Sequence, residues 1–225
     1  IHQLHRKNMN PDTNTNLAYG NPNLTQKTII EKTSILDILF SDFESMPFPI
    51  NESQVTKNEL NEISKNVITI QIPDNNKLLD NYLMLDRNFR QSIVNTFKEH
   101  NIDIEDLVNN IYDDIQPLLL RLKYYYNRPR PFQLAAAYNF KLFPFESKTA
   151  GSPSYPSGHT LLAKVVLTVI AIKYPNHEKL CENLINITSY SRIYLGHHYQ
   201  SDNDFAIEIA NAILNNKKFC AKYNL

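Results

Sequence analysis

Apolar residues recur at intervals of three and four through most of this chain, and this spacing constrains the fold more than any other feature. Such intervals place the apolar side chains on one face of a helix. The predicted helices cover residues 34–43, 77–100, 103–126, 158–174, 177–195 and 201–217. Pro117 is expected to kink the third of them. Only residues 67–72, which include Val67 and Ile70, have the character of a strand. The sequence therefore predicts an all-α, single-domain helical bundle.

The first 30 residues differ from the rest, because they are rich in Asn and lack apolar spacing. We expect residues 1–30 to form a polar, poorly ordered arm and residues 31–225 to form the helical domain. No signal peptide is visible, so the compartment stays open: periplasmic or secreted if a leader has been removed, cytoplasmic otherwise. Cys181 and Cys220 are compatible with one disulfide or, slightly favoured, with two thiols.

Charge and motifs exclude several classes of function. The 23 basic and 23 acidic residues cancel, so bulk electrostatics give no reason to expect nucleic acid as a partner. The longest apolar stretch, Val165–Ile172, is far shorter than the ~20 residues of a membrane span. Neither a zinc-type Cys/His cluster nor a glycine-rich phosphate loop is present, so no metal site and no cofactor are expected. The oligomeric state, including a homo-oligomer, is left open.

A first candidate segment lies at the end of the predicted helix 103–126. Lys123 is followed seven residues later by Arg130 and then by Pro131. A lysine ammonium and an arginine fork could converge on one phosphate group. By itself this pattern is weak, because a basic helix end is more often a solvated face.

A second segment, Ser154–Thr160, coincides with the start of the next predicted helix. The amides of Ser157 and Gly158 are expected to point outward at the helix N-terminus, where free N–H groups bind anions. His159 would then stand beside the bound group. The alternative interpretation is a histidine that merely caps the helix or satisfies a polar neighbour.

The third segment contains Arg192, His198 and Asp202. A carboxylate four residues after a histidine can fix its tautomer, which makes the other ring nitrogen a nucleophile. Arg192 would add a second guanidinium to the anion site. His197 competes as nucleophile but lies five residues from Asp202, and a salt-linked histidine without a catalytic role is the structural alternative.

Together, Lys123-x6-Arg130-Pro131, Pro156-Ser157-Gly158-His159 and Ser191-Arg192-x5-His198-x3-Asp202 resemble the three signature motifs of the type 2 phosphatidic acid phosphatase (PAP2) and vanadium haloperoxidase superfamily. The middle motif is similar to that of the class A nonspecific acid phosphatases. This resemblance implies a phosphatase with a helical-bundle fold. Such an enzyme needs no cofactor and acts on a small phosphate ester.

The resemblance also implies roles for these residues. His198 would be the nucleophile that forms a phosphohistidine, His159 the general acid and base, and Asp202 the residue that orients His198. Lys123, Arg130, Ser157, Gly158 and Arg192 would bind the phosphate. The alternatives are a vanadium haloperoxidase, a diphosphate or lipid-phosphate phosphatase, and an inactive scaffold. Tyr155, Tyr194 and Tyr199 are candidates for the leaving-group side, although such tyrosines are more often part of a core.

Overall fold

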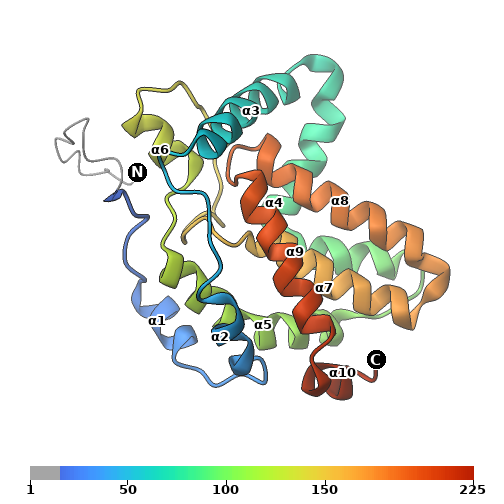
Figure 1. Ribbon diagram of the computed structural model, residues 1–225. Coiled ribbons are helices and arrows are strands. Elements are labelled where there is room, and N and C mark those ends of the chain that lie inside the picture. The colour runs from blue at the N-terminus through green and yellow to red at the C-terminus, as the bar shows by residue number, and fades with distance from the viewer. Residues whose placement is uncertain (1–15) are drawn as a thin grey trace.

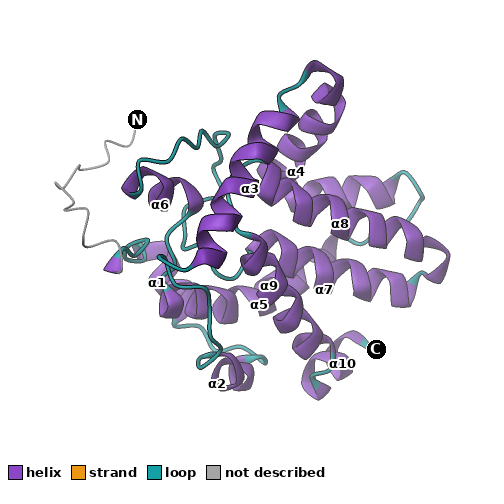
Figure 2. Cartoon of the chain, turned by 45° about the horizontal axis from the view of Figure 1, so that its top comes forward, coloured by secondary structure: helices purple, strands orange, loops and turns teal. Residues whose placement is uncertain are grey.

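The helices that the apolar spacing predicts are present in a computed structural model of the chain, which describes residues 16–225. Within this range no residue belongs to a strand, so the all-α prediction is confirmed (Figures 1 and 2). Short 3₁₀ turns precede α2, α4 and α8. The α-helices are α1 (Leu24–Ile30), α2 (Phe40–Phe43), α3 (Gln54–Ile70), α4 (Asn76–Lys98), α5 (Glu105–Tyr126), α6 (Pro131–Ala137), α7 (Gly158–Lys173), α8 (Glu178–Tyr194), α9 (Gln200–Leu214) and α10 (Lys217–Tyr223).

Helix α7 is the centre of the core. It is apolar on nearly every face, and it packs against α8 and α9 (Figure 1). Leu161, Val165 and Val169 of α7 are completely buried, and burial of each such side chain stabilises the fold by about 1.5–3 kcal/mol. Because the body of α7 is held on all sides, its first turn, which carries His159, has a fixed position.

Helices α4 and α5 enclose the other side of this first turn. Helix α5 continues as a single helix through Pro117. The backbone instead leaves helical geometry at Asn88 inside α4, where φ is −142° and ψ is 47°. This break is followed by Phe89, whose ring lies edge-on to the imidazole of His159 with 5.8 Å between centroids.

The prediction of a strand at residues 67–72 is wrong, because residues 67–70 are the last turn of α3. Leu60, Ile63, Val67 and Ile70 are buried along one face of α3, which is the period of a helix. Ile68, which a strand would also have used, is 66% exposed. Tertiary burial thus overrides the preference of β-branched residues for strands.

The prediction of a poorly ordered arm is wrong for residues 16–30. Asn23 caps α1 by accepting a hydrogen bond from the Gln26 amide, and the Gln26 side chain donates to the Gly151 carbonyl at 2.8 Å. Gln26 also accepts from the hydroxyl of Tyr124 in α5, at 2.7 Å. Residues 1–15 of the predicted arm lie outside the described residues. Both cysteines are free thiols.

A chain crossing at Gly196 joins the long connection between α6 and α7 to the turn between α8 and α9. The Phe145 amide donates to the Leu195 carbonyl at 3.0 Å. Gly196 has φ +83°, and a Cβ at this position would lie 2.8 Å from the Cβ of Pro144. Only glycine fits both the left-handed backbone and the close approach.

Candidate active site

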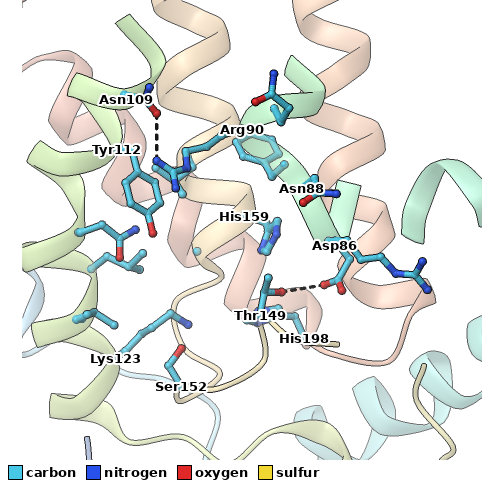
Figure 3. A pocket seen from close by; sticks show the side chains of 18 of the residues that line it. Asp86, Asn88, Arg90, Asn109, Tyr112, Lys123, Thr149, Ser152, His159 and His198 are labelled. Atoms are coloured by element: carbon cyan, nitrogen blue, oxygen red, sulfur yellow. Dashed lines mark hydrogen bonds between the residues drawn. The ribbon is translucent and has the colours of Figure 1, made fainter. Parts of the chain in front are cut away.

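The three candidate segments meet around one cavity of about 470 Å³. Lys123 comes from the last turn of α5, Arg130 precedes α6, and His198 lies in the turn between α8 and α9. Gly158 and His159 form the start of α7. All five line the cavity, and Figure 3 shows Lys123, His159 and His198 among them. The structure thus brings together residues that are up to 75 positions apart in the chain.

The other three predicted residues, Ser157, Arg192 and Asp202, are completely buried and do not line the cavity. Asp202 lies directly behind His198: its Oδ2 is 3.0 Å from Nδ1 of the imidazole. A carboxylate only accepts hydrogen bonds, so Nδ1 carries the proton and the lone pair of Nε2 remains available.

His198 is held in its neutral form. Burial, followed by the positive charges of Arg130 and Lys123, lowers the pKa of His198 well below its usual value. The Nε2 atom lies 2.7 Å from Nη1 of Arg130, and the guanidinium can only donate. This contact supports the tautomer with the proton on Nδ1. A neutral imidazole with its lone pair on Nε2 is what a histidine nucleophile requires.

Arg130 is fixed by backbone carbonyls on both sides of the cavity. Its Nε donates to the Ser152 carbonyl at 2.8 Å and its Nη1 to the His197 carbonyl at 3.0 Å. Burial lowers the pKa of Arg130 to about 10, which still leaves the side chain charged at neutral pH. No carboxylate contacts Arg130 in these bonds, so its charge is available to an anion.

Lys123 completes this end of the cavity. Its Nζ donates to the Pro153 carbonyl at 2.6 Å. Burial, reinforced by the charge of Arg130, lowers the pKa of Lys123 well below its usual value. An anion bound between the two side chains would favour the charged lysine, since opposite charges stabilise each other.

Arg192 pairs with Asp86, a residue that the sequence did not single out. Nη1 of Arg192 donates to Oδ1 of Asp86, and both side chains are buried. Burial raises the pKa of Asp86, but the charge and hydrogen bond of Arg192, together with His197 and the Ser147 hydroxyl, bring the pKa down to about 2. The Nε and Nη2 atoms of Arg192 have no hydrogen-bond partner within the described chain. These two nitrogens keep unused donors, although Arg192 does not line the cavity.

The prediction for the Ser157 amide is wrong, because this N–H donates to the backbone carbonyl of Asp202 at 3.0 Å. The hydroxyl of Ser157 donates to Thr160 at 3.0 Å. Gly158 and His159 are the first residues of α7, so their amides have no carbonyl partner within the helix. The helix dipole adds partial positive charge at this point. The amides without a carbonyl partner inside the helix therefore begin at Gly158, one residue later than predicted.

His159 lies in the same cavity, across from His198. Burial, followed by the charge of Arg192, lowers the pKa of His159 well below its usual value, while Asp86 opposes this effect. His197 is also buried, but neither of its ring nitrogens has a hydrogen-bond partner in residues 16–225. His197 therefore lacks the carboxylate contact that orients His198.

The three candidate tyrosines do not line the cavity. Tyr155 stacks on Phe205 with 4.3 Å between ring centroids, and Tyr194 packs near Tyr82. The ring of Tyr199 is completely buried under the guanidinium of Arg128. Their role in the core is the correct interpretation.

Arg128 is a second residue that the sequence reasoning missed. Its Nη1 donates to Oδ1 of Asp202 at 2.7 Å and to the Ser201 hydroxyl at 2.8 Å, and its Nη2 lies 3.2 Å from Oε2 of Glu59. Asp202 also accepts from the Ser154 hydroxyl. The carboxylate behind His198 is therefore held from several directions.

Comparison with known proteins relates the chain to one family and one fold. Residues 107–215 match the family model of the PAP2 superfamily. The crystal structure of the first transmembrane PAP2 type phosphatidylglycerolphosphate phosphatase from Bacillus subtilis shares the fold, with a TM-score of 0.54. The two sequences are 21% identical, and the match covers 83% of this chain and 94% of the other.

No curated protein matches the sequence. Across residues 16–225, no helix combines the length and apolar character needed to cross a membrane. The family match spans Lys123, Arg130, Gly158, His159 and His198, which are the predicted residues that line the cavity. Residues 107–215 of this chain are thus similar to the PAP2 superfamily, and this segment carries the cavity-lining residues.

Proposed function

We propose that this protein hydrolyses phosphate monoesters without a metal ion, through a phosphohistidine formed on His198. The observation that carries the proposal is the 3.0 Å contact between Nδ1 of His198 and Asp202, which keeps the lone pair on Nε2. That atom faces the cationic groups of Arg130 and Lys123 in one cavity. A nucleophile beside an anion site is the arrangement that phosphoryl transfer needs.

In the first step, Nε2 of His198 attacks phosphorus as the bond to the ester oxygen breaks. His159 in its protonated form gives its proton to the departing oxygen, which leaves as an alcohol. In the second step, the now neutral His159 takes a proton from water, and the water oxygen attacks phosphorus. The phosphorus–nitrogen bond breaks, inorganic phosphate leaves, and both histidines return to their starting states. Asp202 stabilises the positive imidazole ring between the steps.

Positive charge around the phosphoryl oxygens comes from the chain itself. Lys123 and Arg130 line the cavity as charged donors, and Gly158 lines it with a neutral amide. Arg192 lies outside the lining, and two of its nitrogens have no hydrogen-bond partner in residues 16–225. Fixed donors of this kind stabilise the charge that develops in the transition state. The described residues contain no group of three or more His, Cys, Asp or Glu side chains that could hold a metal ion.

Similarity to two kinds of PAP2 phosphatase suggests two classes of substrate. The middle motif, Ser154–Thr160, is similar to that of the class A nonspecific acid phosphatases, which supports a broad activity on soluble monoesters. The Bacillus subtilis protein of similar fold is described as a phosphatidylglycerolphosphate phosphatase, which makes a lipid phosphate the alternative substrate. Both are phosphate monoesters, so the same chemistry at His198 serves either.

Trapping of the covalent intermediate tests the proposal. The His159→Ala variant lacks the base for the second step, so it should accumulate acid-labile, alkali-stable label from a ³²P-labelled aryl phosphate. The label should be absent from the double variant His159→Ala/His198→Ala and present in His159→Ala/His197→Ala. The assignment of the nucleophile would be overturned if label persists in His159→Ala/His198→Ala. It would also be overturned if label is absent from His159→Ala/His197→Ala.

The two histidines should also respond differently to the leaving group. His198→Ala should abolish turnover of every ester. His159→Ala should slow the cleavage of a poor alkoxide leaving group about 10²- to 10⁴-fold, which is the usual contribution of general acid catalysis. The first step with p-nitrophenyl phosphate should be slowed much less, because p-nitrophenolate needs little protonation. Single-turnover rates measure this difference.

A further inference from the structure

The cavity extends well beyond the phosphate site. Lys123, Gln116, Tyr112 and Asn109 line it from one face of α5. Tyr112 is eleven residues before Lys123, which corresponds to about 16 Å along the helix axis. A volume of about 470 Å³ lies within the range of sites that hold whole small molecules. The cavity therefore has room for a leaving group as well as for the phosphate.

The far part of the cavity is polar and positively charged. Helix α4 contributes Arg87 and Arg90, and the facing residues of α5 contribute amides. Asp86 is the single carboxylate among the lining residues, and Arg192 already neutralises it. In the described part of the chain, no ion pair includes Arg87 or Arg90. Among residues 16–225, the charges of Arg87 and Arg90 have no protein counterion.

Arg90 is held in a defined orientation. Its guanidinium carbon lies 4.0 Å from the centroid of the Tyr112 ring, and its Nη1 donates to Oδ1 of Asn109 at 3.1 Å (Figure 3). Both partners are neutral, so they fix the side chain without cancelling its charge. A guanidinium oriented in this way presents its remaining N–H groups as a fork for a phosphate or carboxylate.

We infer that the cavity contains a second anion subsite, formed by Arg90 with Arg87, which selects substrates whose leaving group carries its own phosphate or phosphodiester. The inference rests on the proposed function, in which Lys123, Arg130 and Arg192 hold the phosphate that is cleaved. The preferred substrates are then bisphosphates, or lipids with a phosphodiester beside the terminal phosphate. A monoester of a neutral alcohol fills only the first site.

The test compares α,ω-alkanediol bisphosphates of three to eight carbons with the matching monophosphates, with release of inorganic phosphate as the readout. We expect kcat/KM to be about tenfold or more higher for the best bisphosphate, as for a charge-assisted contact. The chain length at the optimum reports the separation of the two subsites. Phosphatidylglycerolphosphate and phosphatidic acid in detergent micelles form the matched lipid pair and distinguish a lipid substrate from a soluble one.

Single variants test whether Arg90 and Arg87 cause the preference for bisphosphates. Arg90→Gln and Arg87→Gln should reduce the advantage of the bisphosphate and leave kcat/KM for the monophosphate within about twofold. Lys77→Gln removes a charge from the same helix outside the cavity and is the control. Equal activity on both members of every pair in the wild-type protein overturns the inference. An equal loss on both members in Arg90→Gln also overturns it, because it would mean that Arg90 only joins α4 to α5.

Binding distinguishes failure of the subsite from failure of the proposed function. If monophosphates are hydrolysed but bisphosphates show no advantage, only the subsite is wrong. If no ester is hydrolysed, calorimetric titration of the best-fitting alkanediol bisphosphate still decides the matter. Binding weakened about tenfold in the Arg87→Gln/Arg90→Gln variant supports the subsite, and unchanged binding overturns it.

Discussion

Nη1 of Arg128 lies 2.7 Å from Oδ1 of Asp202, while the other carboxylate oxygen of Asp202 contacts His198. Arg128 and Asp202 are both buried, so this pair operates where charges interact strongly. Glu59 of α3 contacts Arg128 from the far side at 3.2 Å. A line of alternating charges therefore runs from α3 to the proposed nucleophile.

Arg128→Gln should lower kcat at least tenfold, because Asp202 loses its charged partner and orients His198 less well. Loss of one member of a buried ion pair also costs about 3–5 kcal/mol, so the melting temperature must be measured alongside. Glu59→Gln is the milder variant, since it removes the charge but keeps hydrogen-bonding atoms. A shift in the acid limb of the kcat/KM–pH profile separates positioning from a loss of folded protein. Unchanged kcat in a folded Arg128→Gln variant would contradict the prediction.

The pH profile should have its maximum on the acid side. The pKa values of His198 and His159 are both lowered, yet His159 must carry a proton to act as an acid. As the pH rises above the lowered pKa of His159, the acid form disappears and kcat/KM for an alkyl phosphate should fall. His198 stays neutral below the usual histidine pKa of about 6.5, so the nucleophile survives mild acid.

His159→Gln is the matched control for this profile. It should flatten the alkaline limb relative to the wild-type protein, whereas ionisation of the substrate affects both proteins alike. An unchanged alkaline limb in His159→Gln would show that another group controls it.

Stability should fall as the pH is lowered from 7 to 5. The pKa values of His159, His197 and His198 are lowered in the folded protein, so the unfolded chain binds more protons below about pH 6.5. The free energy of unfolding therefore decreases as the pH falls through this window. Inorganic phosphate should offset part of the loss, because it binds only the folded site. Melting curves with and without phosphate at each pH measure both effects, and a melting temperature that rises toward pH 5 would contradict the prediction.

Hydrolysis of p-nitrophenyl phosphate should survive prolonged incubation with EDTA, because Lys123, Arg130 and Arg192 provide the positive charge. Orthovanadate should compete with the substrate, since it resembles the five-coordinate transition state. Steady-state kinetics test both expectations. Complete loss of activity that magnesium or zinc restores would eliminate the metal-free mechanism, and bromide oxidation by peroxide after vanadate loading would favour the haloperoxidase alternative.

Gly196→Ala should destabilise the fold and displace His198. The added Cβ would lie 2.8 Å from Cβ and 3.0 Å from Cα of Pro144, and φ of +83° is unfavourable for alanine. We expect a loss of about 1–3 kcal/mol in the free energy of unfolding. Gly151→Ala is the control, because nothing lies within 4 Å of a Cβ there. Equal melting temperatures for the two variants would show that the crossing at Gly196 tolerates a side chain.

Local spacing explains what the sequence could predict. The interval of four between His198 and Asp202 predicted their contact correctly, because one helical turn at the start of α9 brings them together. The long helices α4, α5, α7 and α8 followed from their apolar faces. The helices α1, α6 and α10 have only seven residues each, too few for a repeated apolar spacing, and they were missed. Most of α3 was missed as well, and its β-branched end was assigned the wrong period.

Contacts between distant segments explain what the sequence could not predict. Asp86 reaches Arg192 across 106 positions, and nothing near Asp86 in the chain marks it as a partner. The basic stretch that includes Arg128 and Arg130 suggested an anion site, but only the fold shows that Arg128 points to Asp202 and Arg130 to the cavity. The hydrogen bond from the Ser157 amide to the Asp202 carbonyl likewise depends on the packing of α7 against α9.

The contact between Arg130 and Nε2 of His198 has a consequence for selectivity toward reagents. The Nε2 lone pair of His198 accepts a hydrogen bond from the guanidinium of Arg130. A neutral electrophile does not compete for the guanidinium of Arg130, so Nε2 of His198 stays hydrogen-bonded and less reactive toward it. A phosphate ester competes for the guanidinium and, in doing so, uncovers the atom that attacks it. Under the proposed function, Arg130 should therefore protect Nε2 of His198 from alkylation by neutral reagents, and binding of an anionic substrate to Arg130 should expose it.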